Sequence, residues 1–398
     1  MKNTFKLFGL ITWLVIAALL LAGCSNQARY SDGSTNGNTE IPDGGGTQLP
    51  ENGDPDSDSD DNSNDANHDN DPGNGDTLPP GNSTDPDNGN DESPGDTQPP
   101  VNIERHNWMS RLPDNTFLGN ITIPGTHNSG SADVRLSTWM PDLTGLGQTQ
   151  EHQINMQLNH GIRFFDIRLS LENNRLWVVH GSINAFHGNS RLTFEQVLEW
   201  FRQFLADNPS ETVFMSVRND RGHDLAATFR SYTNDNRFRD LFLRTGTIST
   251  LGDARGNIVL FRRFPGFNDF GIDWLAGWRH DQTFEITRGE ARFSIDDRFE
   301  QRDTNIKAYY VTRNMRNSAS STAENSFHVT FASISGIALI TSPRDFAWNT
   351  NPAMNNVLGE FLQTNSRGRF GAVMMNFYDN NGQNPDLVMN LIRSNFYP

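Results

Sequence analysis

Cysteine is almost absent from this sequence, since Cys24 is the only one among 398 residues. A single thiol excludes an internal disulfide, which an exported protein could otherwise have used. Long apolar runs are also scarce, and the clearest one extends from about Leu7 to Leu21, behind Lys2 and Lys6. A charged start, a short apolar stretch and small residues before Cys24 are typical of a secretion signal rather than of a membrane-spanning helix.

The segment Leu21-Ala22-Gly23-Cys24 is similar to a bacterial lipobox, in which the cysteine is acylated and becomes the mature N-terminus. The resemblance implies that residues 1–24 are a lipoprotein signal peptide and that Cys24 is the lipidation site. Several acyl chains would anchor the protein stably, whereas a single chain binds a membrane only marginally. We therefore expect an exported lipoprotein, held at a membrane of the cell envelope or cell surface. The alternative is an ordinary signal peptide with an incidental cysteine.

Apolar residues are nearly missing from residues 25–100, which consist mainly of Asp, Asn, Gly, Ser, Pro and Thr. Such a segment cannot bury enough surface to offset the entropy of ordering, so a disordered linker is predicted. It contains 18 acidic residues and one basic residue, whereas residues 101–398 contain 30 and 29. The net charge of −16 therefore belongs to the linker. Alternating carboxylates at 54–60 could indicate calcium binding, but they lack a regular period and a closing Glu.

Apolar, strand-like runs alternate with amphipathic stretches through residues 101–398, which is typical of an α/β fold with a mostly parallel sheet. Eight candidate strands suit one domain with an irregular (β/α)8 barrel of the TIM type. Helices are predicted at 193–206, capped by Thr193 with Gln196, and at 151–160, closed by Gly161. The candidate strands are residues 120–123, 163–168, 176–179, 212–217, 257–261, 293–295, 327–332 and 370–377.

Several of these runs end in side chains that carry charge or can transfer protons. In a barrel the catalytic groups lie at the carboxyl ends of the strands, so we expect two histidines and an arginine to converge. Asp166 lies two residues before Arg168, on the same face of its strand. The groups are His127 after residues 121–125, Asp166 and Arg168 in 163–168, and His180 after 176–179.

These segments resemble the bacterial phosphatidylinositol-specific phospholipases C. The resemblance implies cleavage of phosphatidylinositol, or of a glycosylated inositol lipid, by attack of the inositol 2-hydroxyl on phosphorus. Diacylglycerol would leave and a cyclic inositol phosphate would form. It further implies an inositol lipid and a membrane surface as partners, no nucleic acid, no cofactor and a monomeric enzyme. The similar stretches are residues 108–109, 121–130, 148–151, 160–168, 180–181, 204–212 and 251–256.

Two histidines can supply the base and the acid that this reaction needs near neutral pH. We assign His127 as the general base for the inositol hydroxyl and His180 as the general acid for the glycerol oxygen. Arg168 would stabilise the phosphoryl oxygens, and Asp166 would hold the arginine or a histidine. The histidines expected to be structural are His106, His160 and His187.

Whether the catalytic site binds a metal ion depends on the charge of Arg168. In the eukaryotic, calcium-dependent relatives a His-Asn pair and nearby carboxylates bind the ion, and Asn128 resembles that ligand. A guanidinium at Arg168 would repel a cation and would itself supply positive charge. We therefore expect no metal in the catalytic site.

Four further positions match those that contact inositol in the family, namely Arg218, Arg263, Asp297 and Phe299. Arg218 stands in place of a lysine, and Phe299 stands in place of a tyrosine that stacks on the sugar ring. Surface salt bridges are the alternative explanation for the three charges. Trp274 and Trp278, in a predicted loop at 265–280, are candidates for membrane contact.

Two carboxylates expected in the bacterial family are amides here, at Asn128 and Asn376. An amide oxygen can orient His127 but offers no full charge to stabilise its imidazolium, so catalysis would be weaker. Asp379 could substitute for Asn376 if the last strand ended early. Two alternatives therefore stay open: an inositol-lipid-binding module with weakened catalysis, or a phosphodiesterase of the same fold that acts on another headgroup.

Overall fold

The computed structural model describes residues 102–335, 341–364, 368–379 and 386–396. The signal segment 1–24, the lipidation site Cys24 and the linker 25–100 lie outside the described residues, so these assignments stay predictions. Among the described residues, none of the helices has the length and apolar character that crossing a bilayer requires.

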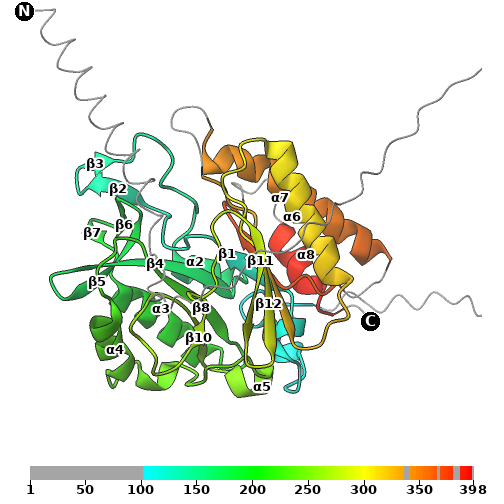
Figure 1. The fold of residues 1–398 in the computed structure, drawn as a ribbon, viewed down its shortest axis with the longest axis horizontal. Coiled ribbons are helices and arrows are strands. Elements are labelled where there is room, and N and C mark those ends of the chain that lie inside the picture. The colour runs from blue at the N-terminus through cyan, green and yellow to red at the C-terminus, as the bar shows by residue number, and fades with distance from the viewer. Residues whose placement is uncertain (1–101, 336–340, 365–367, 380–385, 397–398) are drawn as a thin grey trace, which may run out of the picture. The chain divides into compact units, whose positions relative to one another are not determined.

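A curved sheet of mainly parallel strands forms the centre of the fold (Figure 1). Parallel pairing joins its strands in the order β9-β8-β4-β1-β14-β13-β12. The short strand β10 (Ile272–Asp273) extends this sheet beside β9, and β11 (Thr283–Arg288) lies antiparallel to β12. The bounds are β1 (Ile123–Thr126), β4 (Phe164–Glu172), β8 (Val213–Asn219), β9 (Ile258–Arg263), β12 (Ala291–Asp296), β13 (Ser326–Phe331) and β14 (Ala372–Met375).

Aromatic side chains fill the interior and show that the sheet curls into a barrel. The rings of Phe214 in β8 and Phe327 in β13 lie 6.2 Å apart, although three strands separate them in the sheet. Phe261 in β9 also contacts Phe293 in β12, at 6.1 Å, across the open side of the strand order. No hydrogen-bonded strand pair joins β10 to β11 in the described ranges. The expected irregular barrel is confirmed.

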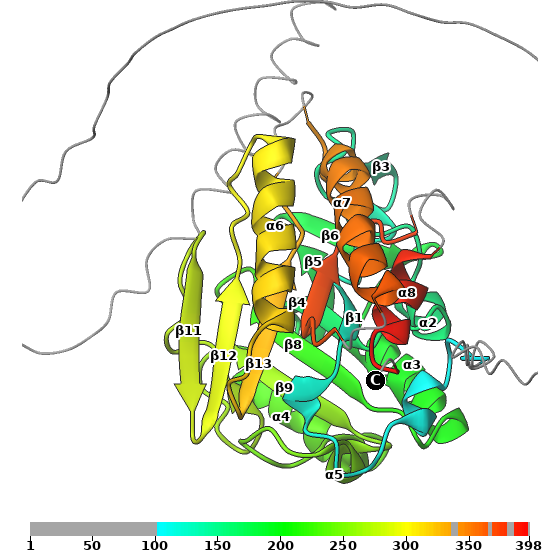
Figure 2. The ribbon, with the colours of Figure 1, turned by 90° about the vertical axis from the view of Figure 1, so that its right-hand side faces the viewer.

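Helices cover the outside of the barrel, and α6 and α7 lie side by side on one flank (Figure 2). Arg316 in α6 pairs with Glu360 in α7 at 2.7 Å. Short 3-10 helices occur at Trp108–Arg111, Leu118–Asn120 and Arg239–Leu241. The α-helices are α2 (Ile154–Asn159), α3 (Phe194–Asp207), α4 (Ala226–Asn234), α5 (Leu251–Ala254), α6 (Thr304–Ala319), α7 (Pro343–Gln363) and α8 (Leu387–Arg393).

One expected barrel strand is wrong. Residues 176–179 belong to β5 (Arg175–His180), which runs antiparallel to β4 in a hairpin. The turn residues Asn173 and Asn174 have φ of 52° and 57°, the conformation of a type I′ turn that matches the twist of hairpin strands. β5 continues into a small antiparallel sheet with β6 (Ile183–His187), β2 (Val134–Ser137), β3 (Met140–Pro141) and β7 (Ser190–Arg191).

The predicted helix at 193–206 is confirmed as α3, where the Thr193 hydroxyl accepts a hydrogen bond from the Gln196 backbone N–H. The other predicted helix begins later than expected, at Ile154. Its end is as predicted, because Gly161 follows with φ of 99°. The first strand is also shifted: residues 118–120 form a 3-10 turn, and β1 starts at Ile123. This shift places His127 directly after the strand.

Candidate active site

The charged and proton-transferring side chains gather where the parallel strands end. β1 is followed by His127 and β14 by Asn376, while Asp166 and Arg168 in β4 follow Phe165, which pairs with the last residue of β1. Because parallel strands place their carboxyl ends at one end of a barrel, side chains distant in sequence meet there. The other groups at strand ends are His180 at the end of β5, Arg218 and Asp220 around the end of β8, Arg263 at the end of β9, and Asp297 after β12.

His127 is held between an amide and a guanidinium. Its Nδ1 lies 3.0 Å from Asn376 Oδ1, and its Nε2 lies 2.8 Å from Arg168 Nη2. Since an arginine can only donate, Nε2 accepts, and the proton assigned to Nδ1 is donated to Asn376. Burial, followed by the positive charge of Arg168, lowers the pKa of His127 to about 3. The imidazole is therefore neutral near pH 7, with its basic nitrogen turned toward Arg168.

Asp166 holds Arg168 in place. Its Oδ2 accepts hydrogen bonds from Arg168 Nε and Nη2, both at 3.1 Å, and from the backbone N–H of Asn128 at 3.1 Å. Burial opposes the charge of Asp166, but the attraction of Arg168 outweighs it and places the pKa of the carboxyl below its usual range. Of the two roles expected for Asp166, holding the arginine is the one with direct contacts.

His180 faces His127 across the site. The centroids of the two rings lie 6.3 Å apart and their planes are nearly perpendicular. His180 Nδ1 lies 2.8 Å from the carbonyl oxygen of Gly147, so Nδ1 carries a proton and Nε2 is the nitrogen left for chemistry. Burial and the charge of Arg168 lower the pKa of His180. The expected convergence of two histidines on one arginine is present in the structure.

Asp220 is a site residue that the sequence analysis missed. Its Oδ2 accepts a hydrogen bond from the N–H of Gly181, at 2.9 Å, next to His180. Its Oδ1 lies 3.3 Å from Arg218 Nε and 3.9 Å from Arg168 Nη1. Burial opposes its charge, yet Arg168 and Arg218 lower the pKa of this carboxyl. In the sequence, Asp220 could have been found from its position directly after β8 and two residues after Arg218.

Arg263 is buried and stacks on an aromatic ring. Its guanidinium carbon lies 3.5 Å from the centroid of Trp278, and its Nη1 lies 3.9 Å from Asp166 Oδ1. Burial, reinforced by Arg218, lowers the pKa of Arg263 to about 9. Arg263 is therefore not part of a surface salt bridge, which was the alternative explanation for its charge. Trp278 therefore covers a site arginine, and its expected membrane contact has no support.

The expected membrane contact of Trp274 is wrong. Trp274 is fully buried, and its ring lies 4.2 Å from Phe261 inside the barrel. A run rich in aromatic residues and glycine predicts a loop equally well whether it packs inward or outward. In this protein the ring of Trp274 packs in the apolar interior of the barrel.

Asp297 and Lys307 occupy the other side of the site. Asp297 is buried, and burial raises the pKa of its carboxyl despite the nearby charges of Arg263 and Lys307. Lys307, in α6, donates to the carbonyl oxygens of Arg298 (2.6 Å) and Phe331 (2.7 Å). It thereby ties the ends of β12 and β13 together, a role that its sequence position did not reveal. The ring partner of Phe299 is His280, at 4.9 Å, rather than a member of the catalytic cluster.

The two amides differ in their surroundings. Asn376 contacts His127, whereas Asp379 pairs with His152 Nε2 at 3.1 Å, so the expectation that Asp379 could replace Asn376 is wrong. Asn128 is fully buried with φ of 48°. Neither Oδ1 nor Nδ2 of its side chain has a hydrogen-bond partner within the described ranges.

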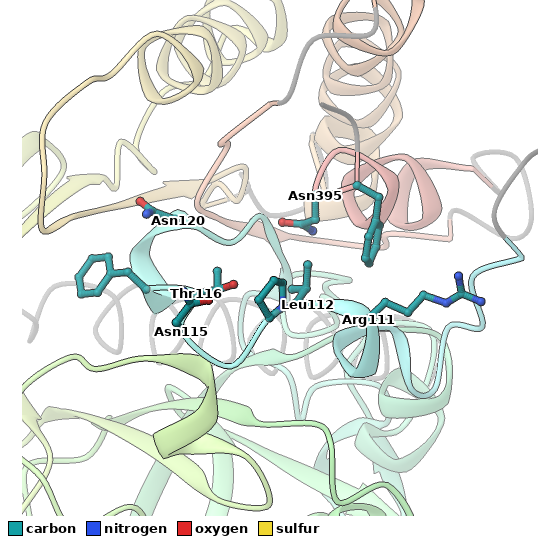
Figure 3. A pocket seen from close by; sticks show the side chains of 9 residues that line it. Arg111, Leu112, Asn115, Thr116, Asn120 and Asn395 are labelled. Carbon is teal, nitrogen blue, oxygen red and sulfur yellow. The ribbon is translucent and has the colours of Figure 1, made fainter. Parts of the chain in front are cut away.

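The histidines expected to be structural have partners outside this site. His106 lies 3.3 Å from Glu104, His160 Nδ1 lies 2.8 Å from the Tyr378 hydroxyl, and His187 packs on Trp200. A pocket elsewhere lies at the other end of the barrel (Figure 3). Asn120, which lines it, precedes β1, whereas His127 follows that strand. Its lining of Arg111, Leu112, Pro113, Asn115, Thr116, Phe117, Asn120, Asn395 and Phe396 holds no histidine or carboxylate.

A barrel with a neutral histidine, a second histidine and a fixed guanidinium at one end defines an enzyme site for acid–base cleavage at an anionic centre. Residues 121–264 match the family model described as phosphatidylinositol-specific phospholipase C, X domain. The 1-phosphatidylinositol phosphodiesterase of Staphylococcus aureus strain Newman is 29% identical over 311 residues, covering 73% of this chain and 94% of the relative.

Solved structures agree with this match. A Staphylococcus aureus phosphatidylinositol-specific phospholipase C, studied for its membrane binding, superposes with a TM-score of 0.62 at 25% identity, covering 73% of this chain and 98% of that one. The enzyme of the same name from Listeria monocytogenes gives a TM-score of 0.59 at 26% identity, with 74% and 99% covered. Residues 121–264 thus match the X domain of phosphatidylinositol-specific phospholipase C, and most of the chain is similar to bacterial enzymes of that name.

Proposed function

We propose that this protein cleaves phosphatidylinositol, or a glycosylated form of it, to diacylglycerol and inositol 1,2-cyclic phosphate. The observation that carries the proposal is the geometry of His127 and His180, whose rings face each other at 6.3 Å with Arg168 in contact with His127. A single phosphate can then be approached by a base, an acid and a fixed positive charge.

In the proposed reaction His127 Nε2 accepts the proton of the inositol 2-hydroxyl. The 2-oxygen forms a bond to phosphorus while the bond from phosphorus to the glycerol oxygen breaks. Protonated His180 gives its Nε2 proton to that departing oxygen, so the chain ends the step with one imidazolium at His127 and a neutral His180. A bound phosphate offsets the factors that lower the pKa of His180, because a nearby negative charge favours the protonated form.

Arg168 has two roles in this proposal. Without substrate it donates to His127 Nε2 at 2.8 Å, which occupies the nitrogen that must act as the base. A phosphate oxygen that takes over this donor would leave Nε2 open and would place the guanidinium against the charge that grows in the transition state. Because Asp166 fixes the guanidinium here, the site supplies its own positive charge and needs no metal ion.

Arg218, Arg263 and Asp297 are the proposed contacts for the inositol ring. The two arginines come from the ends of the neighbouring strands β8 and β9, and the carboxylate follows β12. They can hydrogen-bond to ring hydroxyls as donors and acceptor. Phe299 lies against His280, so its proposed stacking on the sugar would require it to leave that partner.

The test is the cleavage of phosphatidylinositol in mixed vesicles, followed by phosphorus NMR in the presence of a chelator. Wild-type protein is expected to give a cyclic phosphate signal, and His180→Ala is expected to be at least about 100-fold slower. His187→Ala, whose ring packs on Trp200, is the matched control and should act like wild type. Equal rates for wild type and His180→Ala would contradict the acid–base assignment.

A binding module with weakened turnover is the second candidate, and Asn376 favours it. A neutral amide, rather than a carboxylate, supports the Nδ1 proton of His127. Vesicle binding that is specific for phosphatidylinositol, with no cyclic phosphate formed over hours, would favour this candidate over the enzyme.

Membrane contact is proposed at the turn between β2 and β3 and the residues that follow. Trp139 is 77% exposed and Leu143 is 63% exposed, and Gly147, which holds His180, lies a few residues later. A tryptophan suits the membrane interface because it combines an apolar ring with a polar N–H. Flotation with phosphatidylinositol vesicles should show weaker binding for the Trp139→Ala, Leu143→Ala double variant. Unchanged flotation would locate the contact elsewhere.

We also propose that Cys24 carries the lipid that holds the protein at its membrane. The similarity of Leu21-Ala22-Gly23-Cys24 to a lipobox and the long polar segment that follows support a membrane-anchored localisation. Metabolic labelling with a fatty acid should mark the wild-type chain and not Cys24→Ser. Label retained by Cys24→Ser would contradict the assignment.

A further inference from the structure

A second group of metal-binding side chains lies outside the catalytic cluster. Glu151 and His152 come from the segment before α2, and Asp379 comes from the chain after β14. One ligand atom of each residue lies within 4.8 Å of the other two, and His152 Nε2 is 3.1 Å from Asp379 Oδ2. The side chains of His152 and Asp379 are 23% and 31% exposed, so an ion could enter from solvent.

The carboxylates of this group have cationic neighbours. Arg344 lies 2.5 Å from Glu151 Oε1, so a bound cation competes with Arg344 for Glu151, and the charge of Arg105 acts on His160 and Tyr378, which both contact His152. The ring of His160 lies 4.8 Å from that of His152.

We propose that Glu151, His152 and Asp379 form a binding site for a divalent transition metal, with zinc as the best match. An imidazole nitrogen with two carboxylates is a donor set that zinc accepts, with water in the fourth position. At zinc's usual bond lengths tetrahedral ligands lie about 3.4 Å apart, close to the His152–Asp379 spacing of 3.1 Å. Glu151, whose ligand atom lies within 4.8 Å of the other two, would have to turn from Arg344 toward the ion. Calcium prefers six to eight oxygen ligands, which this group does not supply.

The ion would join two segments that support the general base. Gln150, next to Glu151, donates through Nε2 to the carbonyl oxygens of His127 (2.8 Å) and Met375 (2.9 Å). Asp379 lies three residues after Asn376, the partner of His127 Nδ1. A metal bound by both segments stabilises the folded state by mass action and takes no part in the chemical step.

The test is zinc binding by tag-free, full-length protein that has been stripped of metal, measured by calorimetry and thermal unfolding. One saturable zinc ion and a raised unfolding temperature are expected, with at least about tenfold weaker binding for His152→Ala and Asp379→Asn. Arg344→Gln should bind zinc more tightly, because it removes the competing cation. Cobalt in place of zinc should give the visible absorption bands of a tetrahedral site.

His106→Ala is the matched control, because His106 also lies beside a carboxylate, Glu104, at 3.3 Å. It should bind zinc like wild type, and weak binding by the acidic linker is common to all variants. The proposal is overturned if His152→Ala and Asp379→Asn retain wild-type affinity, or if His106→Ala loses as much. Because zinc binding is measured without lipid, its result is independent of whether the protein cleaves phosphatidylinositol.

Discussion

Two histidines near the end of β14 have partners of opposite kinds. His127 is buried and its Nδ1 contacts the amide of Asn376, whereas the partly exposed His152 contacts the carboxylate of Asp379. The two partners lie three residues apart in the chain. The histidine assigned as the base therefore has the weaker electrostatic support, and the one outside the site has the stronger. In the proposed mechanism the chemistry at His127 depends on displacement of Arg168, which Asp166 holds, rather than on a carboxylate at Nδ1.

The largest expected effect comes from removing the two rings in turn. His127→Ala should lower the rate of phosphatidylinositol cleavage by about 1,000-fold, because the reaction loses its base. His152→Ala should stay within about threefold of wild type, since that ring makes no contact with the reacting groups. Initial rates on mixed vesicles measure both. A comparable loss of rate in both variants would contradict the assignment of His127 alone as the general base.

Exchanging the partners gives the next largest effect. Asn376→Asp should raise the pKa of His127, because a carboxylate favours the imidazolium, and should raise the rate at neutral pH by about tenfold or more. The acid limb of the kcat/KM profile, set by a His127 pKa of about 3 in the wild type, should move to higher pH. Asp379→Asn should change neither. A slower Asn376→Asp enzyme would show that the amide itself is required.

The smallest effect is on stability in acid. The folded state holds the pKa of His127 near 3, against about 6.5 when unfolded, so the unfolded chain binds the extra proton between these values. Stability should fall as pH drops from 7 to 5, and His127 should account for about 2 kcal/mol of this loss. His127→Gln should flatten the fall, as denaturant unfolding at both pH values would show.

Strand ends and short-range patterns could be predicted from the sequence. Apolar runs that stop at His127 and Arg263 identify the carboxyl ends of strands, and a barrel must then bring these ends together. Arg168 lies four residues before the end of β4, because that strand continues into the hairpin with β5. Thr193 and Gln196 mark a helix start through contacts within a few residues. In each case the information is local, because the spacing of side chains along one element determines the outcome.

Relations between distant segments could not be predicted in the same way. An apolar run of four residues looks alike in a parallel barrel strand and in a hairpin, so its pattern does not distinguish β5 from a barrel strand. The positive φ of Asn173 and Asn174 and the antiparallel pairing with β4 define the hairpin. Asp220 reaches the site because β8 pairs with β4, and the sequence alone does not show that these two strands are neighbours. Whether Asn376 or Asp379 reaches His127 depends on where β14 ends, which its sequence does not mark.

The ammonium of Lys307 has a practical consequence. Residues 25–398 contain only this lysine, and its Nζ is enclosed between two carbonyl oxygens at the ends of β12 and β13. Amine-reactive reagents can therefore modify that stretch at one side chain alone, and only when local opening exposes it. The rate at which the peptide with Lys307 gains the label therefore measures how fast this end of the barrel opens, and the same end carries His127 and His180.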